Sequence, residues 1–462
     1  MAVSAFKKAI IFSVLTWLTF NICIKAQETL PSYLMPGTAQ QSLFNPAYQN
    51  KSGKLIIGIP LLSGIEASSN TSVTFNSIFS EGFKYSFKKL YNDLGDQGEA
   101  QIFANASMFF ASLKHNNYTY SLSISERVFS ELIFDKEIIK LIRDGTQKYY
   151  GTNENFGGVS FRLQQFREIA PGISKRINQN LDIGIRLKIL FGKLYLNTKN
   201  IYLSAETDPQ NNELLIKSQG SYKLSGPFSY NSDSENSLST FSTKIYPGDY
   251  FFQPRNLGFA LDAGIIFRPS DITELSVSLN DIGFTGFKYN SYRVQFTRPL
   301  RYTEYSLYQS HSPEEVNYRE PLEALRAYSD SLINITDVNE SPDRFISYLP
   351  IKINISGKYQ FSEKYFGGII NQFYFMNKKL ANLFSAFIYT SSVKNFEFGT
   401  GVSVYNLRCL KPGLGISYSR KKYQIFFTSN NIWGIINPTG SKHLNLYFGI
   451  NLLFDINREE IE

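Results

Sequence analysis

Apolar and polar residues alternate with a period of two along much of this chain. Between residues 444 and 454 every second position is apolar, and the positions between them are mostly polar or glycine. The same alternation recurs over residues 181–189, 257–267, 351–356 and 396–404. A period of two is that of a β-strand, whose successive side chains point to opposite faces. The pattern therefore predicts many strands with one apolar and one polar face.

The predicted strands are long, and their connections sort by length. Strands of globular proteins average about 5–6 residues, whereas these reach ten or more, which suits a tilted strand that crosses a bilayer. We expect fourteen strands, near residues 55–64, 102–113, 118–126, 158–175, 181–195, 257–267, 273–283, 349–359, 365–376, 380–391, 396–406, 413–419, 423–432 and 443–454. Short connections then alternate with others that include every long one: 65–101, 127–157, 196–256 and 284–348.

This sorting by parity predicts the fold class. Bacterial outer-membrane barrels have an even number of strands, short periplasmic turns, long outer loops and both chain ends inside. We therefore expect an all-β protein, a transmembrane antiparallel β-barrel of about 14 strands with small helical elements in the outer loops. The alternative is a secreted all-β protein, because a soluble sandwich also alternates apolar and polar positions.

Local signals fit the predicted connections. Pro269-Ser270-Asp271 and Asn178-Gln179-Asn180 are turn-forming residues at places where two strands must reverse. Two of the long connections carry the apolar spacing and the end signals of short helices, from Asp135 to Gly145 and from Pro321 to Leu332.

The first residues have the pattern of a secretory signal. Lys7 and Lys8 precede a mostly apolar stretch, and the small residue Ala26 precedes Gln27 at the expected cleavage site. A membrane anchor is the alternative, but the apolar stretch is shorter than the roughly 20 residues that a spanning helix needs. We expect a signal peptide at 1–26, an N-terminal periplasmic or plug segment at 27–53, an outer-membrane β-barrel at 54–454 and a periplasmic tail at 455–462.

Composition excludes several other classes. The chain has 462 residues, of which 39 are Phe and 30 are Tyr, far too much ring surface for a disordered protein. Only two cysteines and three histidines are present, which rules out a disulfide scaffold and disfavours a multi-histidine zinc site. Removal of the signal with its three lysines lowers the formal charge from +8 to +5, so we expect no nucleic-acid partner.

Charged residues on the polar faces of two strands are the candidate site. Asp182, Arg186 and Lys188 share the polar face of one strand, and Asp262 lies on that of another. They are candidates for lumen-facing ligand contacts that select solutes. The alternative, which we favour, is a salt-bridged network that fills the barrel. The pattern singles out no catalytic, cofactor-binding or metal-ligating residue, so we do not expect an enzyme or a cofactor.

Two motifs resemble known families. Phe44-Asn45-Pro46-Ala47 is similar to the element that opens the barrels of FadL-type hydrophobic-compound transporters and PorV-type outer-membrane proteins. The stretches NLGFALDAG at 256–264 and SLNDIGF at 278–284 resemble the signature of an uncharacterised family of Bacteroidota outer-membrane proteins. That likeness extends over nearly the whole mature chain and implies an outer-membrane barrel. No residue matches a known ligand-binding position of the fatty-acid transporters.

Two functions remain open at this stage. The first is a FadL-like channel for a hydrophobic or small compound, in which residues 27–48 plug the lumen and move to admit it. The second is a PorV-like, non-transporting docking or assembly component for secretion or surface proteins, with loops 196–256 and 284–348 as the binding surface. Both place the protein in the outer membrane of a Gram-negative (diderm) bacterium, with membrane lipid and either a small hydrophobic ligand or a surface or secretion protein as partners.

Overall fold

The structure is a computed structural model in which most of the chain is described. The described residues are 30–35, 37–50, 54–78, 86–144, 147–208, 213–227, 229–230, 241–242, 255–296, 299–302, 339–376, 379–391, 393–405 and 409–455. The predicted signal peptide with its cleavage site, the predicted helix from Pro321 to Leu332 and nearly all of the predicted tail lie outside these residues.

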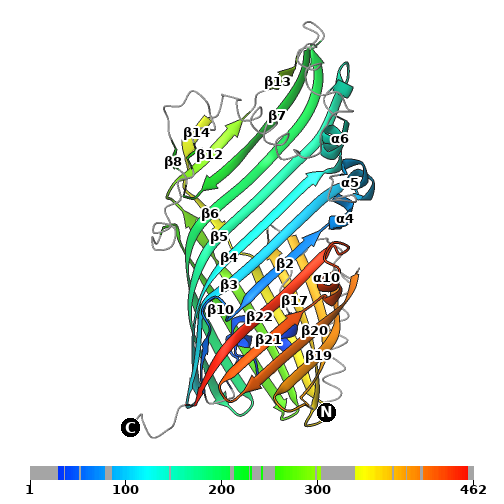
Figure 1. Cartoon of the computed structure of the whole chain (residues 1–462). Helices are drawn as coiled ribbons and strands as arrows, with labels where there is room; N and C mark the ends of the chain where they lie inside the picture. The colour runs from blue at the N-terminus through cyan, green and yellow to red at the C-terminus, as the bar shows by residue number, and fades with distance from the viewer. Residues whose placement is uncertain are drawn as a thin grey trace.

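One antiparallel sheet of twenty strand segments dominates the fold and closes on itself (Figure 1). The ring closes where β1 pairs with β22, with Lys54 opposite Asp455. The segments are β1 (Lys54–Gly58), β2 (Ile65–Thr71), β3 (Gln97–His115), β4 (Tyr118–Asp135), β5 (Asn153–Asn178), β6 (Leu181–Asp208), β7 (Glu213–Ser225), β10 (Leu257–Ser270), β11 (Thr273–Phe287), β12 (Ser291–Phe296), β13 (Pro299–Tyr302), β14 (Asn339–Pro342), β15 (Phe345–Tyr348), β16 (Ile351–Gln360), β17 (Tyr365–Met376), β18 (Lys379–Thr390), β19 (Phe396–Tyr405), β20 (Cys409–Arg420), β21 (Tyr423–Ser429) and β22 (His443–Asp455). A separate two-stranded sheet joins β8 (Ser229–Tyr230) to β9 (Phe241–Ser242).

Several segments share one place in the ring. β1 and β2 both lie between β22 and β3, and β15 and β16 both pair with β11. Among the described residues the pairings therefore pass through fourteen ring positions, where the sequence suggested about fourteen strands. β7 pairs with β6 from Tyr195 to Asp208, and β12, β13 and β14 join it there, so this side of the wall extends further than the rest (Figure 1). We call this part of the wall, together with the ends of β5 and β6 that lie in it, the upper extension.

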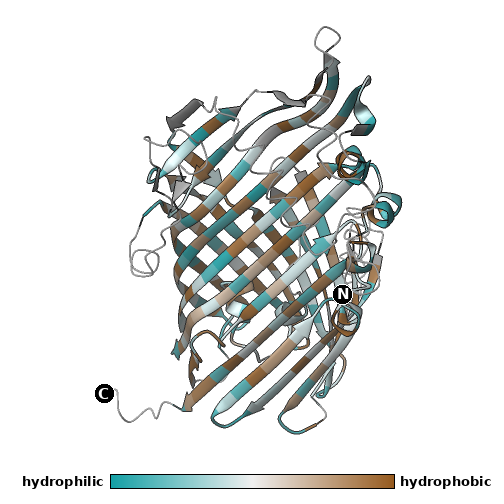
Figure 2. Ribbon diagram, turned by 45° about the horizontal axis from the view of Figure 1, so that its top comes forward, coloured by the Kyte–Doolittle hydropathy of each residue, from teal (hydrophilic) through white to brown (hydrophobic). Residues whose placement is uncertain are grey.

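Along several strands the apolar side chains face outwards and the polar side chains are buried, the reverse of a water-soluble protein. On β6, Leu187 is 57% exposed, whereas its neighbours Arg186 and Lys188 are 4% and 3% exposed. β10 shows the same pattern, and its apolar residues on the outer surface are Leu257, Phe259, Leu261, Ile265 and Phe267. Figure 2 shows hydrophobic and hydrophilic residues alternating along strands of the wall. On β6 and β10 the polar face consequently points into the lumen. We call the exposed apolar zone of the outer surface, which includes residues 183–189 of β6 and 257–267 of β10, the apolar band.

The connections follow the expected parity, but the strands are longer than the sequence suggested. The turns at 116–117, 179–180 and 271–272 all lie at one end of the barrel, which confirms Asn178-Gln179-Asn180 and Pro269-Ser270-Asp271 as turn sites. The expected loops 65–101, 127–157, 196–256 and 284–348 are wrong in large part, because β2, β7 and the upper ends of β3 to β6 occupy much of them. Beyond the apolar band both strand faces are mixed or polar, so the period-two signal fades although the hydrogen-bonded ladder continues.

Helices are short and lie mainly above the wall or inside the ring. α6 (Lys136–Asp144) confirms the helix expected from Asp135, and its Ile138 and Leu141 pack on Phe156 of β5. The other helices of the described residues are α2 (Leu30–Leu34), α3 (Gln41–Phe44), α4 (Phe75–Ile78), α5 (Phe87–Asp93), η2 (Gln147–Tyr149) and α10 (Ile432–Ile436). In the described part of the chain no helix is long and apolar enough to cross a membrane.

A closed ring should resist detergent. Because β1 and β22 pair, the ring offers no free edge from which SDS can begin to unravel the ladder. We expect the folded chain, left unheated in SDS, to run at a different gel position from the same sample after boiling. Identical mobility before and after boiling, for protein that binds detergent as a folded species, would contradict closure.

Candidate functional site

The N-terminal segment, defined here as residues 30–35 and 37–50, crosses the lumen near the end with the short turns (Figure 1). Its contacts reach strands all around the ring. Tyr389 of β18 donates a hydrogen bond to the Pro31 carbonyl at 2.7 Å, and the Tyr33 hydroxyl lies 2.6 Å from that of Ser276 on β11. Gln40 exchanges hydrogen bonds with Asn451 of β22, at 2.7 and 3.0 Å. The segment therefore spans the lumen and connects strands on different sides of the ring.

Asn45, Pro46 and Ala47 lie directly on the barrel wall. The Ala47 amide donates to the Asn45 side chain at 2.9 Å, which fixes a tight turn. Beneath the turn, Gly184 of β6 stands opposite Gly264 of β10. A Cβ on Gly184 would collide with the backbone of Pro46, and one on Gly264 would collide with the Asn45 side chain. The two glycines therefore form the seat on which this motif rests.

An apolar cluster anchors the other half of the segment. Its members from the segment, which include Leu34 and Phe44, pack against aromatic residues of the wall such as Tyr447. The rings of Phe44 and Tyr447 meet edge to face, with centroids 6.1 Å apart. The full cluster of buried residues is Tyr33, Leu34, Met35, Phe44, Ile370, Leu383, Phe387, Tyr389, Phe426 and Tyr447. This end of the lumen is therefore packed, not open.

Arg186 joins the segment to the charged part of the lumen. Its guanidinium donates to the carbonyls of Ser42 and Leu43, at 3.3 and 2.6 Å. The same group binds the Asp262 carboxylate, with an Nε to Oδ2 distance of 2.8 Å. Asp262 lies opposite Arg186 in the register of β10 and β6. One arginine therefore ties the segment to two wall strands.

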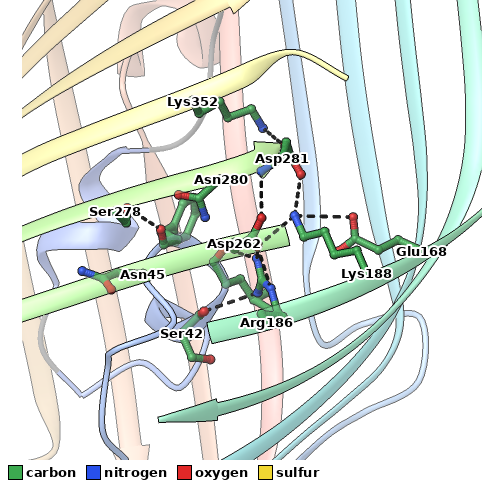
Figure 3. A network of polar contacts seen from close by, with 12 residues as sticks. Ser42, Asn45, Glu168, Arg186, Lys188, Asp262, Ser278, Asn280, Asp281 and Lys352 are labelled. Carbon is green, nitrogen blue, oxygen red and sulfur yellow. Dashed lines mark hydrogen bonds and ion pairs between the residues drawn. The ribbon is translucent and has the colours of Figure 1, made fainter. Parts of the chain in front are cut away.

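Six further charged residues surround this arginine and form with it the lumenal charge cluster (Figure 3). Lys188 is central: it lies 2.9 Å from Asp262 and also pairs with Asp281. Asp281 accepts two hydrogen bonds from Arg127, both at 2.9 Å, and lies 3.0 Å from Lys352. The cluster consists of Arg127, Glu168, Arg186, Lys188, Asp262, Asp281 and Lys352. All are at most 8% exposed, and four cations face three carboxylates.

A local backbone irregularity brings the two aspartates together. Asp281 adopts a left-handed φ of 63°, and the register of β10 with β11 shifts between Leu261 and Ala263. Such a bulge re-aims side chains on one strand relative to its partner. Asp262 accepts a hydrogen bond from the Asp281 backbone amide at 2.7 Å, which supports the unusual conformation. Two carboxylates therefore share the surrounding cations.

The structure separates the four residues that the sequence singled out. Arg186, Lys188 and Asp262 come together in the cluster as a salt-bridged network. Asp182 points into the lumen but lies nearer the short turns, where it binds Arg176 at 3.1 Å and Arg268 at 2.7 Å. Sequence reasoning missed four members of the cluster: Arg127, Glu168, Asp281 and Lys352. Asp281 lies in the SLNDIGF stretch and Lys352 on the polar face of an alternating strand, so both carried a signal.

A cavity lies against the charge cluster and is bounded by the N-terminal segment. Its volume is about 60 Å³, and Leu43 and Phe44 line it on one side. Ser123, Ser125 and Asn105 face it from β4 and β3. A polar cavity of this size has room for several ordered waters. Among the described residues, no group of three or more His, Cys, Asp and Glu could hold a metal ion.

Comparison with known proteins gives one family match. The sequence profile described as "Family of unknown function (DUF5723)" matches residues 46–430. No curated protein matches the sequence.

Several solved structures resemble the fold at a distance. A Pseudomonas aeruginosa FadL homologue is 9% identical, with 95% of this chain and 100% of that chain covered and a TM-score of 0.47. The Ralstonia pickettii toluene transporter TbuX is 8% identical, with 92% and 94% covered and a TM-score of 0.43. At such identities and TM-scores these likenesses assign no activity.

The glycine seat makes a testable prediction. Gly184→Ala places a Cβ against the Pro46 backbone, so we expect the N-terminal segment to leave the wall while the barrel itself stays folded. Gly357→Ala is the matched control, because its Cβ would have no neighbour closer than 3.5 Å. Limited proteolysis should cut residues 30–50 at least several times faster in Gly184→Ala than in the control. Equal cleavage rates would show that the segment does not depend on this seat.

Proposed function

The chain belongs to the family of unknown function DUF5723, and we propose that it is an outer-membrane channel for a small or hydrophobic compound, closed by its own N-terminal segment. The proposal includes export by a signal peptide that is cleaved after Ala26, and a location in the outer membrane of a diderm bacterium. The single observation that carries it is how the segment is attached: among the described residues, the backbone-to-backbone hydrogen bonds of residues 31–48 all stay within the segment, so it pairs with no wall strand.

The outer surface of the wall supports a membrane location. The eleven residues 257–267 of β10 present exposed apolar side chains at alternate positions. At about 3.3 Å per residue and a tilt of about 45°, such a stretch spans roughly 25 Å along the barrel axis, the height of the apolar band of outer-membrane barrels. Exposed apolar surface on this scale is unfavourable in water. Lipid is the solvent that suits this face.

The interior supports passage. The segment blocks the lumen without forming part of the ring, so it can leave while every strand pairing persists. Side-chain hydrogen bonds hold much of it, each with a net contribution of about 0.5–1.5 kcal/mol, or more where a charged group such as Arg186 takes part. A segment held in this way can leave the lumen without breaking the sheet. A strand of the wall could not.

The docking alternative gains less support. It relies on loops 196–256 and 284–348, parts of which are wall strands in the structure. Much of the remainder lies outside the described residues, and no contact of the described part favours a protein partner over a solute.

The membrane location makes a prediction for the outer surface. Leu187→Arg puts a charge in the middle of the apolar band, and we expect it to reduce the free energy of unfolding in lipid vesicles by about 2–4 kcal/mol. Tyr202→Arg is the control on the same strand, because Tyr202 is 47% exposed but lies in the upper extension, where the cost is about 0–1 kcal/mol. Urea titrations of both variants in vesicles measure the difference.

Equal and small losses for the two variants, together with recovery of the chain from cells as a soluble periplasmic protein, would contradict a membrane-spanning wall.

Movement of the segment makes a prediction for passage. Ala47 of the segment packs on Ile266 of β10, so cysteines at both positions can lock the segment to the wall. With Cys409 replaced by serine, we expect the oxidised Ala47→Cys, Ile266→Cys variant to pass arabinose into vesicles several times more slowly than after reduction. Gly184→Ala should pass it faster than the unmodified chain.

The control for the lock is the Ala47→Cys single variant, whose rate should not respond to reductant. If the locked and reduced forms pass arabinose equally, the segment is not the closing element. If neither the unmodified chain nor Gly184→Ala passes any solute, the protein is not a channel.

A further inference from the structure

A second cavity lies in the lumen on the far side of the charge cluster from the N-terminal segment. We name it the upper cavity; its volume is about 40 Å³. Arg162 and Gln164 line it from β5. Because β5 runs from the upper extension towards the short turns, both residues lie on the upper side of Glu168, a member of the charge cluster. Arg127 and Lys352 line both cavities and connect them.

Arg162 differs from the other lumenal arginines. It is 6% exposed, yet no Asp or Glu among the described residues forms an ion pair with it. Its Nη2 donates only to neutral oxygens, of Gln164 at 3.5 Å and of Ser347 at 3.3 Å. Its Nε and Nη1 have no hydrogen-bond partner in the described protein. A buried guanidinium that no carboxylate compensates is costly.

Two amide side chains repeat this pattern in the same cavity. Asn70 of β2 and Gln164 are each 3% exposed. Neither side-chain polar atom of Asn70 has a partner among the described residues, nor has Nε2 of Gln164. Buried polar groups are nearly always hydrogen-bonded, so unpartnered donors gathered from two strands that line one cavity indicate a ligand that accepts from them.

The remaining lining gives the ligand its character. Phe103, Phe129 and Phe166 provide ring surfaces, and Arg162 stands 5.9 Å from the centroid of Phe129. Arg127, Arg162 and Lys352 are the charged residues in the lining, and no acidic residue contributes to it. A mostly apolar pocket with a few convergent polar groups is the usual form of a small-molecule site. Here the polar groups can donate hydrogen bonds, and the arginines and the lysine among them are positively charged.

We propose that the upper cavity binds a small organic anion, a carboxylate on a flat apolar body. The carboxylate accepts from Nη1 of Arg162, which has no protein partner, and from Nη2, whose contacts with neutral oxygens are long at 3.3 and 3.5 Å. These two parallel hydrogen bonds have the geometry for which a guanidinium is suited. The amides of Asn70 and Gln164 donate to the same oxygens. Because about 40 Å³ holds the carboxylate end and not the whole ligand, the apolar body extends from the cavity into the lumen along the phenylalanine rings. A phosphate fits less well, because its higher charge and hydration do not suit these ring walls. As a substrate class for the channel, this inference rests on the proposed function.

Equilibrium binding to the full chain in detergent tests the site, with benzoate as the probe. Calorimetry should detect benzoate, and benzyl alcohol, which keeps the ring and lacks the charge, should bind at least about tenfold more weakly. Inorganic phosphate should also bind at least about tenfold more weakly than benzoate. Equal affinity for benzoate and benzyl alcohol would overturn the anion site, and tighter binding of phosphate would overturn the organic ligand.

Substitutions locate the site. Arg162→Gln should weaken benzoate binding at least about tenfold, and Arg162→Lys, which keeps the charge without the fork, should fall between it and the unmodified chain. Arg293→Gln is the control, because Arg293 is a half-exposed arginine of the upper extension that pairs with Asp343. Asn70→Ala, which leaves the buried charge in place, should weaken binding several-fold and serves if Arg162→Gln does not fold. Undiminished binding by whichever of these variants folds overturns the assignment.

Binding and passage fail separately. Benzoate that binds to an arabinose-impermeable barrel, with loss in Arg162→Gln, would leave the site standing and the channel wrong. Arabinose passage without measurable benzoate binding would leave the channel standing and the site wrong.

Discussion

The contact between Arg186 and Asp262 joins the wall of this barrel to the segment that crosses its lumen. Arg186 is buried, and Asp262 is the carboxylate directly opposite it on the neighbouring strand. With its charge compensated there, the guanidinium can use its other donors on the carbonyls of Ser42 and Leu43. Without Asp262 it would lose the one carboxylate with which it forms an ion pair among the described residues, in a lumen where charge is expensive. Asp262 also forms an ion pair with Lys188 and accepts a hydrogen bond from the backbone amide of Asp281. The Arg186–Asp262 pair therefore holds the wall strands and the N-terminal segment together.

This arrangement follows from a strand pattern that sends every second residue inwards. Such a pattern fills a lumen with polar groups that must find partners across it, and the charge cluster meets that requirement with residues from β4, β5, β6, β10, β11 and β16. Beneath Asn45 and Pro46, however, the inward positions are glycines, Gly264 and Gly184, which leave space for the segment. The same alternation therefore yields a tightly paired region in one layer and a fitted seat in the next.

The strands of the ring could be predicted from the sequence, but the ion pairs between side chains in the lumen could not. Alternation over 181–189 was enough to predict which residues of β6 face inwards, and loop parity predicted which ends carry the short turns. The partners were not predictable, because Asp182 and Arg186 share one strand face yet bind different groups. Asp281 joins the cluster only because a bulge and a left-handed backbone re-aim it, and no period-two pattern encodes that. The upper strand ends were missed because beyond the apolar band neither face needs to be hydrophobic.

The two cavities differ in how their cations are compensated, and under the proposed function this difference would link closure to selection. Next to the segment, each cation of the cluster pairs with a carboxylate. The cavity beside the segment therefore offers no unpaired charge that would select a solute. Above it, Arg162 has only neutral partners among the described residues. Arg127 lines both cavities and binds Asp281, which pairs with Lys188; Lys188 and Arg186 in turn share Asp262. An anion in the upper cavity would draw on Arg127 and compete with Asp281 for it, which shifts the charge balance that holds Arg186 on the segment. This chain of contacts identifies Arg127 as the residue through which an occupied upper cavity would weaken the contact between Arg186 and the N-terminal segment.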